Sequence, residues 1–285
     1  MSDYLGAHPD IFMARKEMHY FGSDLKFGPH FFRRNEQEYL AEYRQWNRQR
    51  QAGEASVWYL FSREAAAEIK AFNPDARIII MLREPAAMLY SLYHQFKVDG
   101  NENLPTVEEA LAAESLRREG RKMARTVYFP AGLVYRETAR YTDQVRRYLD
   151  LFGREQVHVI IYDDFAADPG GAYQKVTQFL GVGPTPAQTD FGVVNGNKRI
   201  RSSALRAVLS EPMVRASVLA CRQWLPKSVF GVLQRTEACL QRYNTRPAAR
   251  PPLDRELRAQ LKREFAPVVE RLSSLLERDL TYWNR

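Results

Sequence analysis

Runs of apolar residues along the chain predict buried strands. The clearest are "RIIIML" (77–82) and "VHVIIY" (157–162), each aliphatic on both faces, as in a strand buried within a parallel sheet. The run "SVWYLF" (56–61) is a third candidate. Because helix-period segments alternate with these runs, the pattern predicts an α/β fold with a parallel sheet flanked by helices.

Helical periodicity between and after these runs predicts the main helices. One helix over 141–152 ends at Gly153, and a second follows Pro169 and ends at the Gly/Pro-rich turn 180–186. From about 204 onward the pattern is helical, and Pro267 should kink the last helix, at about 253–281. One stripe of that helix carries Leu257, Leu261, Phe265, Val268, Leu272 and Leu275.

The simplest organisation is one domain over 1–285, with an α/β core over 1–203 and a mainly helical part over 204–285. A hydrophobic content of 45% over 285 residues can fill a sizeable core. No apolar stretch reaches the roughly 18 residues that a membrane-spanning helix needs, and the N-terminus does not resemble a signal peptide. We therefore expect a cytoplasmic protein with no membrane partner.

The charge balance favours anionic partners. Lys and Arg number 42 against 34 Asp and Glu, which gives a net charge of +8. Such a field attracts nucleotides, sulfated or phosphorylated substrates, nucleic acid or anionic lipid. The cations are spread along the chain and mark no recognition motif, which disfavours nucleic acid. The two cysteines and five histidines show no metal-ligand spacing, so no metal is expected.

The stretch "MLREPAAMLYSLYHQF" (81–96) suggests an anion site. Arg83 follows a predicted buried strand, where ligands gather in open α/β sheets, and Pro85 suits the first position of a helix. Ser91 lies about one and a half turns into that helix. A guanidinium and a hydroxyl can bind a phosphate together. The alternative is that Arg83 pairs with a carboxylate, Glu84 or Glu64, at the strand end.

Two further polar stretches are candidates for chemistry. In "HPDIFMARKEMHYF" (8–21), Glu17 lies beside His19 and could act as a general base toward a substrate hydroxyl. The alternative there is a solvated charged loop. In "NGNKRIRSS" (195–203), Lys198 and Arg199 belong to a basic turn that could close over an anionic ligand or could be a plain surface patch.

Taken together, these segments resemble the sulfotransferases that use 3′-phosphoadenosine 5′-phosphosulfate, especially the bacterial and heparan-type carbohydrate sulfotransferases. The resemblance runs from residue 4 to the C-terminus. It rests on "HPDIFMARKEMHYF", "GEASVWYLFS", "IIIMLREPAAMLYSLYHQF", "VHVIIYDDFAADP", "FLGV", "NKRIRS" and "LLERDLTYW", in that order.

The resemblance implies a P-loop-like fold and a role for each candidate residue. Arg83 and Ser91 would hold the 3′-phosphate of the nucleotide, and Lys198 and Arg199 would cover it. Glu17 would be the catalytic base, with His19 helping to orient the acceptor. The acceptor would be a carbohydrate or another small molecule, and the oligomeric state cannot be predicted.

The sequence departs from the family in one respect. The family's Gly-rich phosphosulfate loop, with its lysine and preceding strand, should lie just before "DYLGAHPD" (3–10), and no G-x-x-x-x-G-K-[ST] stretch replaces it. The expectation is a weak or inactive catalyst, either because the true start lies upstream or because the chain is a truncated relative. The alternatives are a non-catalytic nucleotide- or glycan-binding relative and a nucleotide kinase, although a kinase would need the absent Walker lysine.

Overall fold

The computed structural model describes residues 1–27, 35–124, 127–183, 198–200, 243, 245–248 and 250–285. These residues form two compact units. The first unit comprises 1–89, 136–194 and 255–285, and the second comprises 90–135 and 195–254. A single domain divided near residue 203 stays a prediction, although the last helix groups with the N-terminal residues in the first unit.

Short strands and helices make up the first unit. Its strands are β1 (Ile11–Met13), β2 (Gln51–Gly53), β3 (Ile78–Leu82) and β4 (Val157–Ile161). Its helices are α1 (Ser2–Gly6), α2 (Glu36–Ala41), η1 (Val57–Tyr59), α3 (Ala65–Phe72), α8 (Tyr141–Phe152), α9 (Tyr162–Ala167), α10 (Pro169–Leu180), α14 (Arg255–Leu276) and η3 (Thr281–Asn284). Helix α7 (Tyr135–Thr138) begins at the boundary between the units, and α4 (Pro85–Asp99) begins in the first unit and continues into the second.

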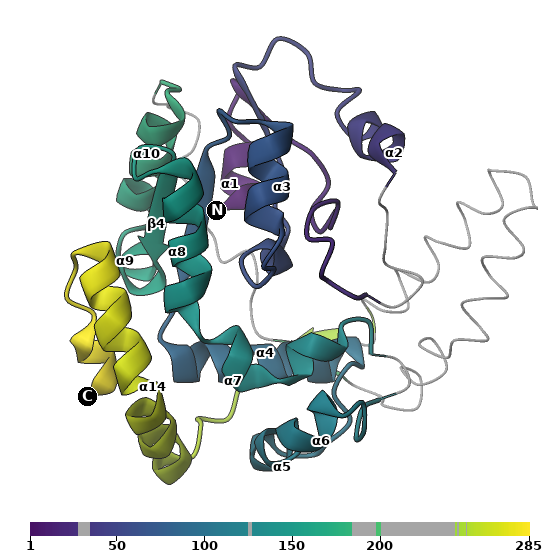
Figure 1. Ribbon diagram of the computed structural model, residues 1–285, viewed down its shortest axis with the longest axis vertical. Coiled ribbons are helices and arrows are strands. Elements are labelled where there is room, and N and C mark those ends of the chain that lie inside the picture. The colour runs from purple at the N-terminus through teal and green to yellow at the C-terminus, as the bar shows by residue number, and fades with distance from the viewer. Residues whose placement is uncertain (28–34, 125–126, 184–197, 201–242, 244, 249) are drawn as a thin grey trace, which may run out of the picture. The chain divides into compact units, whose positions relative to one another are not determined.

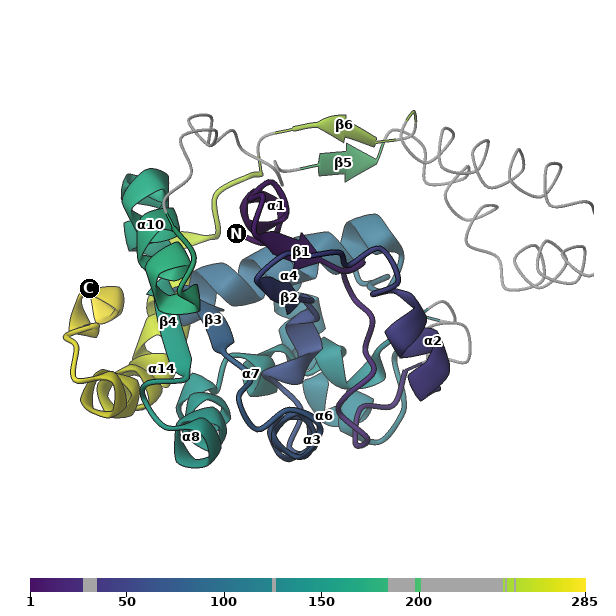
Figure 2. The same cartoon turned by 90° about the horizontal axis from the view of Figure 1, so that it is seen from above.

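The two strands predicted most clearly form a parallel pair. Ile78 of β3 lies opposite Val157 of β4, and the register continues to Leu82 opposite Ile161. Figures 1 and 2 show β4 between α8 and α10, so helices cover both faces of this pair. The predicted α/β arrangement with parallel strands is therefore confirmed. The P-loop-like topology and the missing strand and loop stay predictions.

Each face of the β3–β4 pair contributes to a separate hydrophobic core. Ile80 and Leu82 pack with residues of α8 and α14, including Val145 and Leu272. Ile160, which points to the other face, packs with residues of α1, β1 and α10. This alternation is the period-two pattern of a strand between two layers. Met81 leaves 37% of its area exposed, so burial of β3 on both faces is incomplete.

The helices predicted over 141–152 and after Pro169 form as α8 and α10. Helix α8 ends at Gly153, whose φ of 73° and ψ of 169° suit glycine. The side chain of Asp168 caps α10 by accepting a hydrogen bond from the Gly171 N–H at 2.8 Å. Gly181 then ends α10 in the left-handed conformation.

The prediction of a strand over 56–61 is wrong. The chain forms the single-turn helix η1 there, with Val57 67% exposed and the neighbouring Trp58 and Tyr59 both buried. Two adjacent buried side chains do not fit the alternation of a half-buried strand. The strand lies just before this turn, as β2, and pairs in parallel with β1 from Ile11 opposite Gln51.

The last helix is shorter than predicted. It ends at Leu276, and Glu277 follows with a φ of 52°, a left-handed conformation that a helix cannot continue through. Its buried stripe is also rotated slightly, because Val269 rather than Val268 joins the core. Pro267 lies inside the helix. Every helix in the described part of the chain is too short or too polar to span a bilayer.

The second unit contains the rest of α4, α5 (Val107–Ala112), α6 (Glu114–Arg118), η2 (Pro130–Leu133) and an antiparallel pair, β5 (Lys198–Ile200) with β6 (Thr245–Pro247). Arg117 and Glu102 form a fully buried ion pair at 2.8 Å, and the hydroxyl of Tyr135 donates to the same carboxylate at 2.8 Å. The predicted helices between 204 and 242 lie outside the described residues.

Candidate active site

Glu17 lies on a segment that continues from β1 alongside the chain after β2. The Ala14 N–H donates to the Gly53 carbonyl and the Glu17 N–H donates to the Ala55 carbonyl, both at 2.8 Å. These bonds extend the contact between the two strands beyond their regular ladder. They bring Glu17 to the end of the strand pair, next to η1.

The backbone is strained at both predicted catalytic residues. Glu17 has a φ of 57° and His19 a φ of 48°, in the left-handed region that residues other than glycine rarely occupy. The Nε2 atom of His19 lies 3.4 Å from a carboxyl oxygen of Glu17. The imidazole is buried and stacks on Phe27, with ring centroids 4.4 Å apart. The structure therefore brings Glu17 and His19 together, and strained residues of this kind cluster at functional sites.

The two side chains titrate far from their ordinary ranges. Burial, aided by the negative charge of Glu54, raises the pKa of Glu17 to about 7 against the opposing effects of the Val57 N–H and Lys16. The Glu17 side chain still leaves 43% of its area exposed, so a substrate can reach the carboxyl. Burial lowers the pKa of His19 to about 4. Near neutral pH, a carboxyl that can gain or lose a proton thus lies beside an uncharged imidazole.

The alternative prediction, a solvated charged loop, fits Lys16 better than Glu17. The Lys16 ammonium pairs with Asp3 of α1 at 2.6 Å, and both side chains are more than 40% exposed. The Nδ1 atom of His19, in contrast, is buried and has no hydrogen-bond partner among the described residues. Buried polar atoms are usually satisfied, so this nitrogen is an exception within the segment.

Arg83 follows β3 directly, as the sequence predicts. Its guanidinium lies 4.7 Å from the centre of the Tyr162 ring, at the end of the paired strand β4. No ion pair joins Arg83 to Glu84 or Glu64 within the described part of the chain, and Arg258 approaches the Glu84 carboxylate at 3.6 Å instead. The hydrogen-bond donors of Arg83 thus remain available for an anion.

Ser91 belongs to the second unit, in α4. Its hydroxyl accepts a hydrogen bond from the Arg250 guanidinium at 2.8 Å. Sequence reasoning missed Arg250, whose only signal is its place in the Pro/Arg-rich connector 243–254. Arg83, in contrast, belongs to the first unit.

Lys198 and Arg199 lie in β5, where the structure describes only the backbone. Arg199 is opposite Arg246 of β6 in the antiparallel register. Their predicted role in covering a nucleotide stays a prediction. No group of three or more metal-binding side chains occurs among the described residues.

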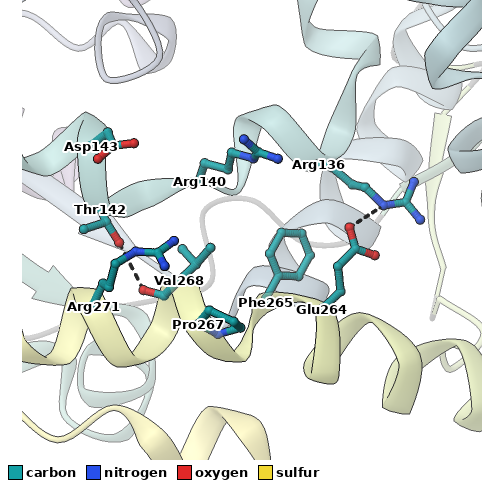
Figure 3. A pocket seen from close by; sticks show the side chains of 9 residues that line it. All are labelled: Arg136, Arg140, Thr142, Asp143, Glu264, Phe265, Pro267, Val268 and Arg271. Carbon is teal, nitrogen blue, oxygen red and sulfur yellow. Dashed lines mark hydrogen bonds and ion pairs between the residues drawn. The ribbon is translucent and has the colours of Figure 1, made fainter.

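A cavity of about 250 Å³ opens in the first unit, and it contains none of the predicted site residues. Figure 3 shows Arg136 directed to Glu264, and these two side chains form an ion pair at 2.7 Å. The Thr142 hydroxyl donates to the Val268 carbonyl at 3.0 Å across the same cavity. These contacts join α14 to the chain around α7 and α8.

Curated sulfotransferases are similar in sequence to parts of this chain. The curated human protein "Heparan sulfate glucosamine 3-O-sulfotransferase 5" is 26% identical over 190 residues, which cover 65% of this chain and 50% of that protein. The mouse "Carbohydrate sulfotransferase 15" is 29% identical over 126 residues, covering 41% of this chain and 22% of that protein. The chain therefore spans at most about half the length of these curated relatives.

A solved structure and a protein family also match this chain. The crystal structure of a sulfotransferase from Alicyclobacillus acidocaldarius is 31% identical, with a TM-score of 0.69, and the match covers 100% of this chain and 93% of that one. The family described as "Sulfotransferase domain" matches residues 29–196, which is more than half of the chain. The chain belongs to the sulfotransferase domain family.

Proposed function

We propose that the protein transfers a sulfuryl group from 3′-phosphoadenosine 5′-phosphosulfate to a hydroxyl or amine of a carbohydrate or small-molecule acceptor. The observation that carries the proposal is the Glu17 carboxyl, which is accessible, titrates near neutral pH and lies beside an uncharged His19. A general base works best when its pKa lies near the working pH. Membership of the sulfotransferase family supplies the type of reaction.

In the proposed reaction, Glu17 removes the proton from the acceptor. The acceptor oxygen or nitrogen forms a bond to sulfur while the bond between sulfur and the bridging phosphate oxygen breaks, and 3′,5′-adenosine bisphosphate leaves with that electron pair. The buried imidazole of His19 limits how the Glu17 carboxyl can turn. The donor supplies an activated sulfuryl group, and the residues of the chain orient the acceptor and take up its proton.

Two groups of residues are suited to the phosphates of the donor. Arg83 offers a half-buried guanidinium with no carboxylate partner among the described residues. Ser91 and Arg250 form a second pair of donors in the other unit. A guanidinium can donate two parallel hydrogen bonds to a phosphate, and a hydroxyl adds a neutral donor. We propose a nucleotide-binding role for each of these residues, and for Lys198 and Arg199.

An anionic carbohydrate is the acceptor class that we favour. The names of the curated relatives point to glucosamine in heparan sulfate and to carbohydrate. The net charge of +8 attracts an acidic or already sulfated chain. Both observations indicate a class of acceptor, and neither selects one sugar.

A transfer assay on matched variants tests the role of Glu17. Glu17→Gln keeps the shape of the side chain but cannot take up a proton, so we expect kcat to fall about 10²- to 10⁴-fold. Glu64→Gln removes an exposed carboxylate outside the site and should leave kcat unchanged. Full activity of Glu17→Gln would remove the base from the proposal.

Calorimetry with 3′,5′-adenosine bisphosphate tests the nucleotide site. We expect Arg83→Ala and Arg250→Ala to weaken binding at least about tenfold each, because a charged hydrogen bond to phosphate is lost. Arg63→Ala, an exposed residue ahead of α3, is the control. Unchanged affinity of Arg83→Ala would remove its assignment. Nucleotide binding by a wild type that transfers no sulfate to any acceptor tested would favour a non-catalytic relative.

A further inference from the structure

We propose that Glu54 is a positioning residue that holds Glu17 and His19 in place through the hydroxyl groups of Ser56 and Tyr59. Glu54 follows β2 directly and lies half-buried next to η1. The inference rests on the proposed function, because it gives Glu54 a purpose only if Glu17 and His19 form the active site. It concerns a carboxylate that neither binds substrate nor takes part in proton transfer.

The first link runs through Ser56. Its hydroxyl oxygen accepts a hydrogen bond from the His19 N–H at 3.1 Å and donates its own proton to Glu54 at 2.9 Å. The direction of the first bond is fixed because a backbone N–H can only donate, and the Ser56 hydroxyl directs its own proton to the Glu54 carboxyl oxygen. Ser56 therefore transmits the position of Glu54 to the backbone of His19.

The second link runs through Tyr59. Its hydroxyl oxygen accepts hydrogen bonds from the N–H groups of Tyr20 at 2.9 Å and Phe21 at 3.3 Å. The same hydroxyl donates to the Glu54 carboxylate, at 3.1 Å from one oxygen and 3.3 Å from the other. Three successive backbone amides, at residues 19, 20 and 21, thus depend on one carboxylate through two hydroxyl groups.

The strain in this segment explains the need for such a network. A left-handed conformation at a residue other than glycine costs of order 1–3 kcal/mol and persists only where the surroundings fix it. Glu17 and His19 both adopt it. Hydrogen bonds to the three amides that begin at His19, together with the bond from the Glu17 N–H to Ala55, hold the backbone at this point.

Glu54 also contributes charge to the site. The groups that act on the Glu17 carboxyl are Glu54, Lys16, the Val57 N–H and the neighbouring His19. Glu54 disfavours a second negative charge and so raises the pKa of Glu17, while Lys16 has the opposite effect. Burial raises the pKa of Glu54 itself, and hydrogen bonds from Ser56, Tyr39 and Tyr59 oppose that rise.

Glu68 of α3 provides a natural control. Its carboxylate accepts hydrogen bonds from the next two amides of the same segment, Gly22 at 2.6 Å and Ser23 at 2.9 Å. Its charge is not among those that change the pKa of Glu17. Glu68 therefore holds the segment in place without changing the pKa of Glu17. Glu54 holds the segment in place and also raises that pKa.

The first test compares Glu54→Gln with Glu68→Gln. The titration of the Glu17 carboxyl is followed by carbon NMR, and kcat/KM for the acceptor is measured against pH. We expect Glu54→Gln to shift both midpoints to lower pH, because the neighbouring negative charge is lost, and Glu68→Gln to shift neither. An unchanged NMR midpoint in Glu54→Gln would overturn the electrostatic part. The NMR titration needs no activity, so it remains informative even if Glu17→Gln proves fully active and the proposed function fails.

The second test removes the bridging hydroxyls with little change in volume. Hydrogen exchange of single amides is measured in Tyr59→Phe and Ser56→Ala, after thermal unfolding shows that each variant is folded. We expect exchange at least about tenfold faster for Tyr20 and Phe21 in Tyr59→Phe, and for His19 in Ser56→Ala, with the amides of Gly22 and Ser23 unchanged. Unchanged exchange at residues 19–21 would overturn the positioning role.

Discussion

Glu17 controls the pH at which the proposed reaction can proceed, because only its ionised form accepts a proton. With a pKa raised to about 7, the carboxylate form becomes dominant as the pH rises through neutrality. We expect kcat/KM for the acceptor to increase with pH through about 7 and then level off. His19, with its pKa lowered to about 4, stays neutral over that range and adds no second step.

The pH profile, measured with saturating donor from about pH 5 to about pH 9, checks this expectation. In Glu17→Gln the residual activity should lose its dependence on pH around neutrality, because the group that titrates is gone. A wild-type profile that is flat through pH 7, or a variant profile with the same midpoint as the wild type, would contradict the assignment of Glu17 as the base.

Residue chemistry could be predicted from the sequence only where a residue type is informative by itself. Glu17 and His19 stand out as a carboxylate and an imidazole two positions apart. Ser56 and Tyr59, which hold the segment, lie 37 to 39 positions from the amides that they bind. Arg250 lies 159 positions from Ser91. Such partners come together only through tertiary folding, so local spacing carries no sign of them.

At the scale of elements, Gly153 permits the turn from α8 toward β4. Its φ of 73° and ψ of 169° lie in a region that essentially only glycine occupies. A Cβ atom there would meet nothing closer than a carboxyl oxygen of Glu155 at 3.9 Å, so space is not limiting. We expect Gly153→Ala to lower the free energy of unfolding by about 1–3 kcal/mol, entirely through backbone strain.

Chemical denaturation of Gly153→Ala and Gly183→Ala separates strain from other effects of the added methyl group. A Cβ atom at Gly183 would have no described atom within 4 Å, and the residue has no positive φ, so its replacement should change stability by less than about 0.5 kcal/mol. Equal stability of the two variants would show that the residue after α8 does not need the conformation of glycine.

Elements with long apolar patterns could be predicted, and short ones could not. Strands β3 and β4 and helices α8 and α10 carry enough apolar positions to define their period. Strand β2 has the sequence Gln-Ala-Gly, which shows no strand pattern, and it forms because β1 pairs with it. The aromatic run after it favours a strand by composition, but Trp58 and Tyr59 are buried side by side in a helical turn. Strand pairing and burial determine the structure of β2 and of this turn, and both depend on residues distant in the sequence.

At the scale of the whole molecule, the compact units are built from chain segments that are distant in sequence. The first unit combines three stretches, and its last stretch, 255–285, follows the second unit along the chain. Composition changes along a sequence can suggest a boundary such as 203/204, but they cannot show that α14 returns to pack with α8 and β3. The membership of Leu272 and Val269 in the core of the first unit is therefore a tertiary property.

The net charge of +8 leads to a prediction for the whole protein. Long-range attraction between a cationic protein and an anionic acceptor speeds their encounter, and salt screens it over a Debye length of about 10 Å at 0.1 M. With the donor saturating, we expect kcat/KM for a carboxylated or sulfated oligosaccharide to fall about tenfold between low salt and about 0.3 M salt. A neutral oligosaccharide of the same length should change much less, because no charge steers it. The same salt dependence for both acceptors would mean that the excess of Lys and Arg does not serve acceptor capture, and the preference for an anionic carbohydrate would then lose its physical basis.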